Sequence, residues 1–318
     1  MVSSERRLKR IAERERLRQR ELQRKKRATR LFTALAVVAA VGALITFAVL
    51  ALNNGTAAAG TAGTEAADNA SQANALRRQL PLQAYTQHYF FEGERSQRYK
   101  ECYASNPALT VEQAIVLVNL DLDSTAYEVA SPVPDPDSFL VLVNKHHYLP
   151  YDYCPPDLDS VGDGDILLRY EAALYLEQLI ASALEDGVFL SPGSGFRYAT
   201  EQEALYNGYV SSLGAEWADA QSARPGFSEH QTGLAVDFRP ANSEFYNTPE
   251  AHWLEEHAHH FGFIIRYTEE NSNVTLFIHE PWHIRYVGVE VANFMHDNAI
   301  GSYEEYYVKY VQHTPPVG

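Results

Sequence analysis

The sequence predicts an α+β domain, built of a small, mostly antiparallel sheet with flanking helices, behind an N-terminal transmembrane helix. Three observations predict this class. A charge-free run of 22 residues lies near the N-terminus, segments with helical periodicity follow Tyr85, and short apolar runs of strand length occur between them. The last two of these runs flank a polar turn, which predicts a hairpin and therefore antiparallel pairing. Helices combined with hairpin-linked strands are typical of an α+β domain.

A basic block precedes the apolar run. Residues 1–30 contain 13 Lys and Arg and four Glu, a net charge of +9, whereas the rest contains 13 Lys and Arg and 37 acidic residues, a net charge of −24. Residues 31–52 are long enough to cross about 30 Å of hydrocarbon, so the lipid bilayer is an expected partner. The positive-inside rule predicts a cytoplasmic N-terminus and an extracellular remainder. A basic run beside a span is typical of a topology signal, so no nucleic acid is expected; signal-peptide cleavage after the span stays an alternative.

Composition divides the rest of the chain. Residues 53–83 are rich in Ala, Gly, Thr and Asn and nearly free of large apolar side chains, which predicts a flexible linker. Large side chains return at Tyr85, so we place an N-terminal extension of the ectodomain at 84–137 and its main domain at 138–313.

The chain has two cysteines, Cys102 and Cys154, and both follow the apolar span. They form no CxxC pair, so a metal site made of thiolates is excluded. An oxidising compartment would allow one disulfide between them, and two unpaired thiols are the alternative.

The individual elements follow from periodicity and from residues typical of caps. Helices are predicted at 110–122, where Thr110 is the capping candidate, at 166–187, where Gly187 ends the helix, and at 249–263 after Pro249. Residues 188–210 predict a short strand, a Pro/Gly turn and another helix. Further strands are predicted at 138–144, at 234–238, and as a hairpin of 262–267 with 274–279.

The stretch FSEHQTGLAVDF, residues 227–238, places His230 and Asp237 seven residues apart. On one continuous strand, two residues at this spacing would point to opposite faces. The two side chains can therefore converge only if the chain turns between them, and Gly233 supplies that freedom. Small Ala235 shares the face of Asp237 and leaves room above the sheet.

The stretch FIHEPWHIRYVG, residues 277–288, contains a second acid and a second histidine. Pro281 interrupts the strand, so Glu280 and His283 can face one cavity. His283 and Arg285 then lie on the same face of the strand that follows.

Two imidazoles and one carboxylate are a common ligand set for a catalytic zinc ion, and they leave the fourth position for water. His230, Asp237 and His283 predict such a site for one Zn²⁺ per chain. A separate carboxylate is needed as general base, and Glu280 fits that role. The alternative is two structural histidines and two surface acids, because His-x6-Asp is a loose pattern and no HExxH helix is predicted.

These residues resemble the signatures of the VanY-type D-alanyl-D-alanine carboxypeptidases, zinc peptidases related to lysostaphin-like enzymes and the hedgehog signalling domain. The family pattern S-x-H-x6-D followed by E-x-W-H matches residues 228–237 and 280–283 position by position. The blocks SGFRYATEQ, residues 194–202, and LVNKHHYLPYDYCPPDL, residues 142–158, also resemble the family, so the resemblance covers about 138–290.

The resemblance implies roles for the remaining site residues. Arg197 is expected to bind substrate and to stabilise the oxyanion, for which a guanidinium is well suited. Gln202 and Ser228 are expected to line the substrate cleft, and Trp282 to form its wall or to serve structure alone. Five further histidines lack a partner motif and are interpreted as packing or surface residues: His146, His147, His257, His259 and His260.

The apolar span predicts a membrane-anchored, extracellular protein, and the resemblance implies a zinc peptidase that removes the terminal D-alanine from peptidoglycan stem peptides. An endopeptidase of the same fold and a wall-binding or signalling module that keeps only the metal are the alternatives. Intact Glu280 and Arg197 favour an enzyme. Whether the substrate ends in D-Ala, D-Lac or D-Ser stays open.

Overall fold

The structure, a computed structural model, describes residue 74 and residues 76–161 and 164–313. The basic block at 1–30, the predicted span at 31–52 and most of the predicted linker lie outside these residues. Within the part that is described, no helix is both long and apolar enough to cross a membrane. The described residues all belong to one compact unit of the chain.

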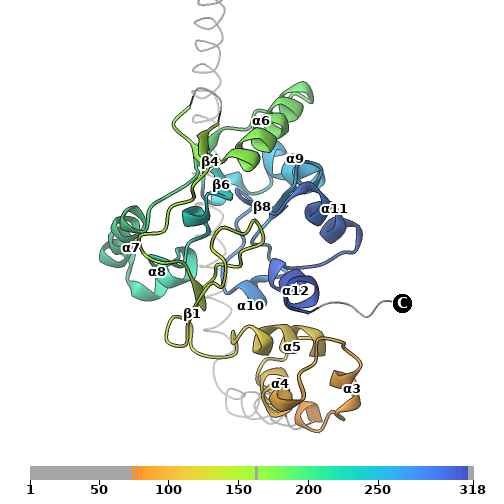
Figure 1. Cartoon of the computed structure of the whole chain (residues 1–318). Helices are drawn as coiled ribbons and strands as arrows, with labels where there is room; N and C mark the ends of the chain where they lie inside the picture. Colours follow the sequence, from red (N-terminus) through yellow and green to blue (C-terminus); the bar gives the residue numbers. More distant parts are fainter. Residues whose placement is uncertain (1–73, 75, 162–163, 314–318) are drawn as a thin grey trace, which may run out of the picture. The chain divides into compact units, whose positions relative to one another are not determined.

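The N-terminal extension folds as a small group of helices (Figure 1). They are α3 (Gln83–Thr86), α4 (Ser96–Ser105) and α5 (Val111–Asn119), with a short 3-10 turn at Gly93–Arg95. The predicted cap is confirmed, because the Thr110 side chain accepts a hydrogen bond from the Gln113 amide, and the Gln113 side chain accepts one from the Thr110 amide. The core of this part includes Tyr85 and Tyr99 and continues into residues near the C-terminus, such as Tyr303.

A four-stranded antiparallel sheet forms the centre of the main domain. Its order is β5 (Pro192–Ser194), β6 (Ala235–Phe238), β8 (His283–Tyr286) and β7 (Phe263–Ile265). Two smaller sheets pair β1 (Ser131–Pro132) with β2 (His147–Tyr148) in parallel and β3 (Leu158–Ser160) with β4 (Leu167–Arg169) in antiparallel orientation. The predicted α+β class is confirmed for the described residues.

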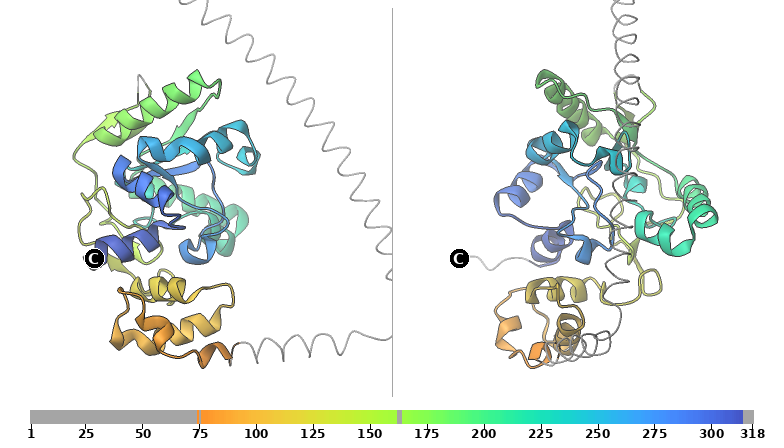
Figure 2. Two further views of the ribbon diagram at one scale, coloured as in Figure 1. Left: turned by 90° about the vertical axis from the view of Figure 1, so that its right-hand side faces the viewer. Right: turned by 180° about the vertical axis from the view of Figure 1, so that it is seen from behind.

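Helices lie on both sides of the central sheet, as Figures 1 and 2 show together. One side carries α6 (Tyr170–Glu185) and α9 (Pro249–His257), and the other carries α7 (Ala199–Leu213) and α8 (Ala215–Gln221). Helix α11 (Val289–Asp297) lies beside the edge strand β7. The short helices α10 (Ser272–Thr275) and α12 (Tyr303–Tyr306) follow later in the chain.

The two faces of the sheet differ in chemistry. Val236 and Phe238 on β6 and Ile284 on β8 belong to the main core, together with Leu176 on α6 and Leu254 on α9. Because side chains alternate along a strand, the intervening residues of β6 and β8 point to the opposite face. That face carries the polar residues of the site.

Three predicted strands or strand boundaries were wrong. Residues 138–144 form no strand, because the buried Arg285 guanidinium donates to the carbonyls of Phe139 and Val141 and replaces a strand partner. The first two residues of 274–279 end helix α10, and the rest form an irregular segment in which Leu276 has a φ of 61°. The predicted hairpin therefore does not form, and β7 pairs with β8 instead. The strand predicted just after Gly187 lies further along the chain. It is β5, which occupies the Pro/Gly segment that was predicted as a turn.

The helix boundaries agree better with the sequence. The predicted helix at 166–187 begins only at Tyr170, because β4 precedes it, and ends before Gly187, which has a φ of +83°. Helix α9 begins at Pro249 behind the Thr248 cap and continues as a 3-10 turn to Gly262. Cys102 is buried and Cys154 exposed, and both are free thiols, so the disulfide alternative is wrong in this structure.

Candidate active site

Strand register brings the two conspicuous stretches of the sequence together. In the antiparallel pair of β6 and β8, Asp237 lies directly opposite His283. The residues before β6 form a 3-10 turn, Glu229–Thr232, which ends at Gly233 with a left-handed φ of +67°. This turn reverses the chain and aims His230 back at Asp237, as the spacing required.

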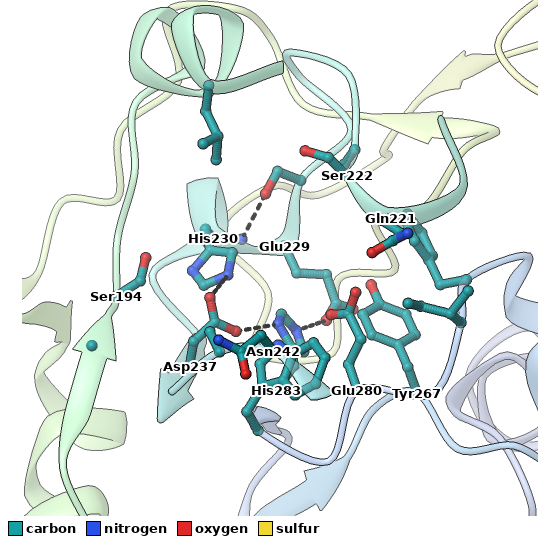
Figure 3. A pocket seen from close by; sticks show the side chains of 18 of the residues that line it. Ser194, Gln221, Ser222, Glu229, His230, Asp237, Asn242, Tyr267, Glu280 and His283 are labelled. Atoms are coloured by element: carbon teal, nitrogen blue, oxygen red, sulfur yellow. Dashed lines mark hydrogen bonds and ion pairs between the residues drawn. The ribbon is translucent and has the colours of Figure 1, made fainter. Parts of the chain in front are cut away.

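The three predicted ligands form one cluster (Figure 3). The Nε2 atom of His230 lies 3.1 Å from Oδ2 of Asp237, and Nδ1 of His283 lies 2.9 Å from Oδ1 of the same carboxylate. One donor atom from each residue lies within 4.8 Å of the others. This arrangement could hold a metal ion with the two ring nitrogens and the carboxylate as ligands.

Both imidazoles are oriented by a hydrogen bond on the ring nitrogen that faces away from the cluster. Nδ1 of His230 lies 2.7 Å from the Gly195 carbonyl oxygen. Nε2 of His283 lies 3.3 Å from a carboxylate oxygen of Glu229. Histidines that bind metals generally donate their second N–H to a carbonyl or carboxylate in this way, so the structure around the cluster fits a metal centre.

The charges in the cluster agree with this interpretation. Burial lowers the pKa of His230, which favours the neutral ring that can bind a cation. Burial opposes ionisation of Asp237, but His230 and His283 outweigh it and hold the pKa of Asp237 well below its usual range. Burial also works to lower the pKa of His283, yet hydrogen bonds to Asp237 and Glu229 raise it to about 9. A metal ion on Nδ1 would therefore displace a proton from His283.

Glu280 lies beside the cluster and lines the same cavity. Its amide donates to the Tyr267 carbonyl, and its own carbonyl accepts from the His283 amide, so a tight turn at Pro281 connects acid and ligand. Burial raises the pKa of Glu280 to about 8. A nearby dication favours the ionised carboxylate, so a metal ion in the cluster would lower the pKa of Glu280. Such a group can accept and return a proton.

Arg197 enters the cavity from the segment between β5 and α7. One guanidinium nitrogen donates to Ser194 Oγ and another to Gln202 Oε1, each at 2.6 Å. Gln202 is buried and in turn donates to Ser222 Oγ and to the Ala223 carbonyl. In this structure Gln202 therefore fixes the guanidinium in one orientation.

The other two predicted substrate residues also have defined contacts. The Ser228 hydroxyl accepts a hydrogen bond from the His230 amide and caps the 3-10 turn that carries this ligand. Trp282 stacks on Tyr246, with ring centroids 5.7 Å apart, and Tyr246 stacks on His279 at 5.2 Å. Tyr246 and Trp282 thus form one wall of the cavity, and His279 packs against Tyr246 without lining it.

The cavity has a volume of about 660 Å³. All eight residues singled out from the sequence line it: Arg197, Gln202, Ser228, His230, Asp237, Glu280, Trp282 and His283. Its far side includes Tyr209 on α7 and Trp217 on α8, which sequence reasoning missed. Neither belongs to a motif, and only the packing of α7 on α8 places them there.

The histidines interpreted as packing or surface residues lie elsewhere. Among the residues that the structure describes, none of them belongs to the lining of this cavity. His146 is buried, and His259 stacks on His296 with ring centroids 3.6 Å apart. His260 is exposed.

Comparison with known proteins finds a family match over the part of the chain that contains this cavity. The family model described as D-alanyl-D-alanine carboxypeptidase, VanY, matches residues 165–289, which include all three predicted ligands and Glu280. The putative carboxypeptidase YodJ of Bacillus subtilis (strain 168) is 36% identical over 191 residues, which cover 56% of this chain and 70% of that protein. The chain belongs to the VanY family of D-alanyl-D-alanine carboxypeptidases.

Two further proteins that this VanY-family chain resembles are also carboxypeptidases. A D-alanyl-D-alanine carboxypeptidase of Enterococcus faecalis (strain ATCC 700802 / V583) is 33% identical over 176 residues, which cover 52% of this chain and 65% of that protein. The solved structure of the LdcB LD-carboxypeptidase is 34% identical with a TM-score of 0.52, and the match covers 57% of this chain and 90% of that one. The resemblance noted in the sequence is confirmed.

Four charged residues next to the ligands were missed as parts of the site. Glu229 occupies the variable position between Ser228 and His230 and pairs with Arg266 and Arg285, and Arg266 also pairs with Glu304. The available signal was an arginine in each of two otherwise apolar strand segments, because a charge there needs a buried partner.

Proposed function

We propose that this VanY-family protein is a membrane-anchored zinc carboxypeptidase that hydrolyses the C-terminal D-Ala–D-Ala bond of peptidoglycan stem peptides. The observation that carries the proposal is the cluster of His230, Asp237 and His283 with Glu280 in the same cavity. Two imidazoles and a carboxylate suit zinc better than calcium or magnesium, which prefer oxygen ligands alone.

Zinc held by these residues would polarise the scissile carbonyl and lower the pKa of water. The Glu280 carboxylate accepts a proton from the attacking water and then returns it to the amine of the leaving D-alanine. Arg197, oriented by Ser194 and Gln202, stabilises the negative charge that develops on the carbonyl oxygen. The stack of Trp282 on Tyr246 shields one side of this chemistry from solvent.

A second candidate is cleavage of the L,D bond that precedes a single terminal D-alanine. It is favoured by the similarity to the LdcB LD-carboxypeptidase. The same catalytic groups serve both reactions, and only the fit of the chain end in the cavity differs. The endopeptidase alternative would need the cavity to accept residues on both sides of the cleaved bond.

Product analysis separates these activities. The full-length protein is incubated with zinc and with pentapeptide or tetrapeptide stems, and the products are identified by mass. Release of D-alanine from the pentapeptide alone supports the proposal, and release from the tetrapeptide alone supports the L,D activity. Internal cleavage would indicate an endopeptidase, and intact peptides with retained binding would indicate a non-catalytic module.

Replacing Arg197 tests the stabilisation of charge. Arg197→Lys is expected to lower kcat by about 10²-fold, because an ammonium cannot donate to Ser194, Gln202 and substrate with the same planar fork. The matched control is Arg224→Lys, since Arg224 pairs with Asp219 and is 42% exposed. Steady-state kinetics on the preferred stem peptide measure both. Equal kcat values for Arg197→Lys and wild type would remove Arg197 from the mechanism.

The membrane anchor and the extracellular position of the catalytic domain are proposed from residues 1–52. We expect protease added to intact cells to digest the region after residue 52 and to spare the basic N-terminal segment. Immunoblots against tags at each end measure this. A C-terminal tag that survives in intact cells, but is lost after permeabilisation, would contradict the topology.

A further inference from the structure

Glu229 is a buried carboxylate directly behind the metal-binding cluster. It is 2% exposed, and its Oε2 atom lies 3.3 Å from Nε2 of His283. The other ring nitrogen of His283 faces Asp237 at 2.9 Å. Figure 3 shows His230, Asp237, His283 and Glu229 joined in one chain of contacts, so the His283 ring is held between two carboxylates.

Two buried arginines hold the second oxygen of Glu229. Its Oε1 atom accepts from Nε of Arg266 at 2.8 Å and from a terminal nitrogen of Arg285 at 2.9 Å, and both arginine side chains are fully buried. Arg266 also forms a two-fold pair with Glu304 of α12, at 2.6 and 3.0 Å. Since the arginines occupy Oε1, Oε2 is left to His283.

The charges of this group balance. Glu229 and Glu304 oppose Arg266 and Arg285, and His283 contacts the group at its edge. Buried ion pairs are weak evidence for stability, because desolvation offsets much of their attraction and apolar residues often replace them without loss. A function in orienting His283, which Glu229 contacts, explains the presence of these charges better.

We propose that Glu229 is a positioning residue of the metal centre, which accepts a hydrogen bond from Nε2–H of His283 and thereby fixes this ring as an Nδ1 ligand. A neutral imidazole carries one proton, and a carboxylate can only accept. Placing the proton on Nε2 leaves the lone pair on Nδ1, which faces His230 and Asp237. The inference rests on the proposed zinc chemistry and extends it to a residue outside the proposed ligand set.

Replacing the carboxylate by an amide tests the inference. In Glu229→Gln, the two arginines retain the amide oxygen, so the amide N–H₂ group turns toward Nε2 of His283. That donor favours the opposite tautomer, with the proton on Nδ1. We expect the zinc Kd of the full-length protein, measured by competition with a chromophoric chelator, to rise about 10- to 100-fold.

The matched control is Glu304→Gln. It makes the same chemical change on the far side of Arg266 and leaves the contact between Glu229 and His283 intact. We expect its zinc Kd to equal that of wild type, even where its Tm falls as much as that of Glu229→Gln. Equal zinc affinities for wild type and Glu229→Gln would overturn the inference, and so would an equal loss of affinity in both variants.

Two measurements cover the case in which Glu229→Gln does not fold. Glu229→Asp keeps the charge opposite the arginines but withdraws it from His283, so its zinc Kd should rise as well; an unchanged value would overturn the inference. In the zinc-loaded wild type, ¹⁵N-edited NMR should show a downfield, hydrogen-bonded Nε2–H proton on His283, and its absence would overturn the inference independently of any variant. A wild type that binds no zinc would instead refute the proposed function.

Discussion

Glu280→Gln is expected to retain zinc and to lose at least about 10²- to 10⁴-fold in turnover, the usual contribution of a general base. The amide has nearly the same shape as the carboxylate but cannot accept the proton of the attacking water. The metal should remain, because Glu280 is not one of the three residues whose donor atoms converge. D-alanine release and zinc content, measured on the same preparations, give both quantities.

The control for this variant is Glu256→Gln, which makes the same change at an exposed position of α9. It should have wild-type turnover. A Glu280→Gln protein that keeps its zinc and hydrolyses stem peptides at the wild-type rate would refute the assignment of Glu280 as base. Loss of zinc together with turnover would instead make Glu280 part of the metal centre.

His230→Ala is expected to lose most of the bound zinc and, with it, activity. Only Asp237 and His283 would remain as protein ligands, and catalytic zinc sites generally use three. The substitution also leaves the Gly195 carbonyl without its ring partner, which lies 2.7 Å away in the structure. Elemental analysis of the purified full-length protein measures zinc per chain.

His260→Ala is the matched histidine control, because His260 is exposed and lies in the 3-10 turn Ala258–Phe261 after α9. It should retain one zinc per chain. Equal zinc content in the His230→Ala and His260→Ala proteins would place the metal elsewhere and refute the ligand set.

The sequence determined those parts of the protein in which local chemistry decides the structure. Thr110 predicted the start of α5, and Pro249 predicted the start of α9, because caps act within one helical turn. Gly233 predicted the reversal between His230 and Asp237, since few other residues adopt a left-handed φ without strain. The two short motifs also predicted that His230, Asp237, His283 and Glu280 share one cavity, which the structure confirms.

Only the tertiary structure decided how distant segments meet. The apolar runs at 138–144 and 274–279 have the composition of strands, but a strand also needs an edge to pair with, and periodicity does not show whether one is available. Residues 138–144 give two of their carbonyls to the Arg285 guanidinium instead. The register that sets Asp237 opposite His283 likewise depends on packing, because β6 and β8 are distant in sequence.

The same reason explains why the sequence pointed to the predicted ligands and not to the charged residues behind them. A ligand is recognised by its type and by its spacing within a motif. Glu229, Arg266 and Glu304 come from three separate segments, and no motif connects them. These side chains are buried in the folded protein, and a buried charge needs an opposite charge nearby. Only the tertiary structure shows which residue supplies that opposite charge.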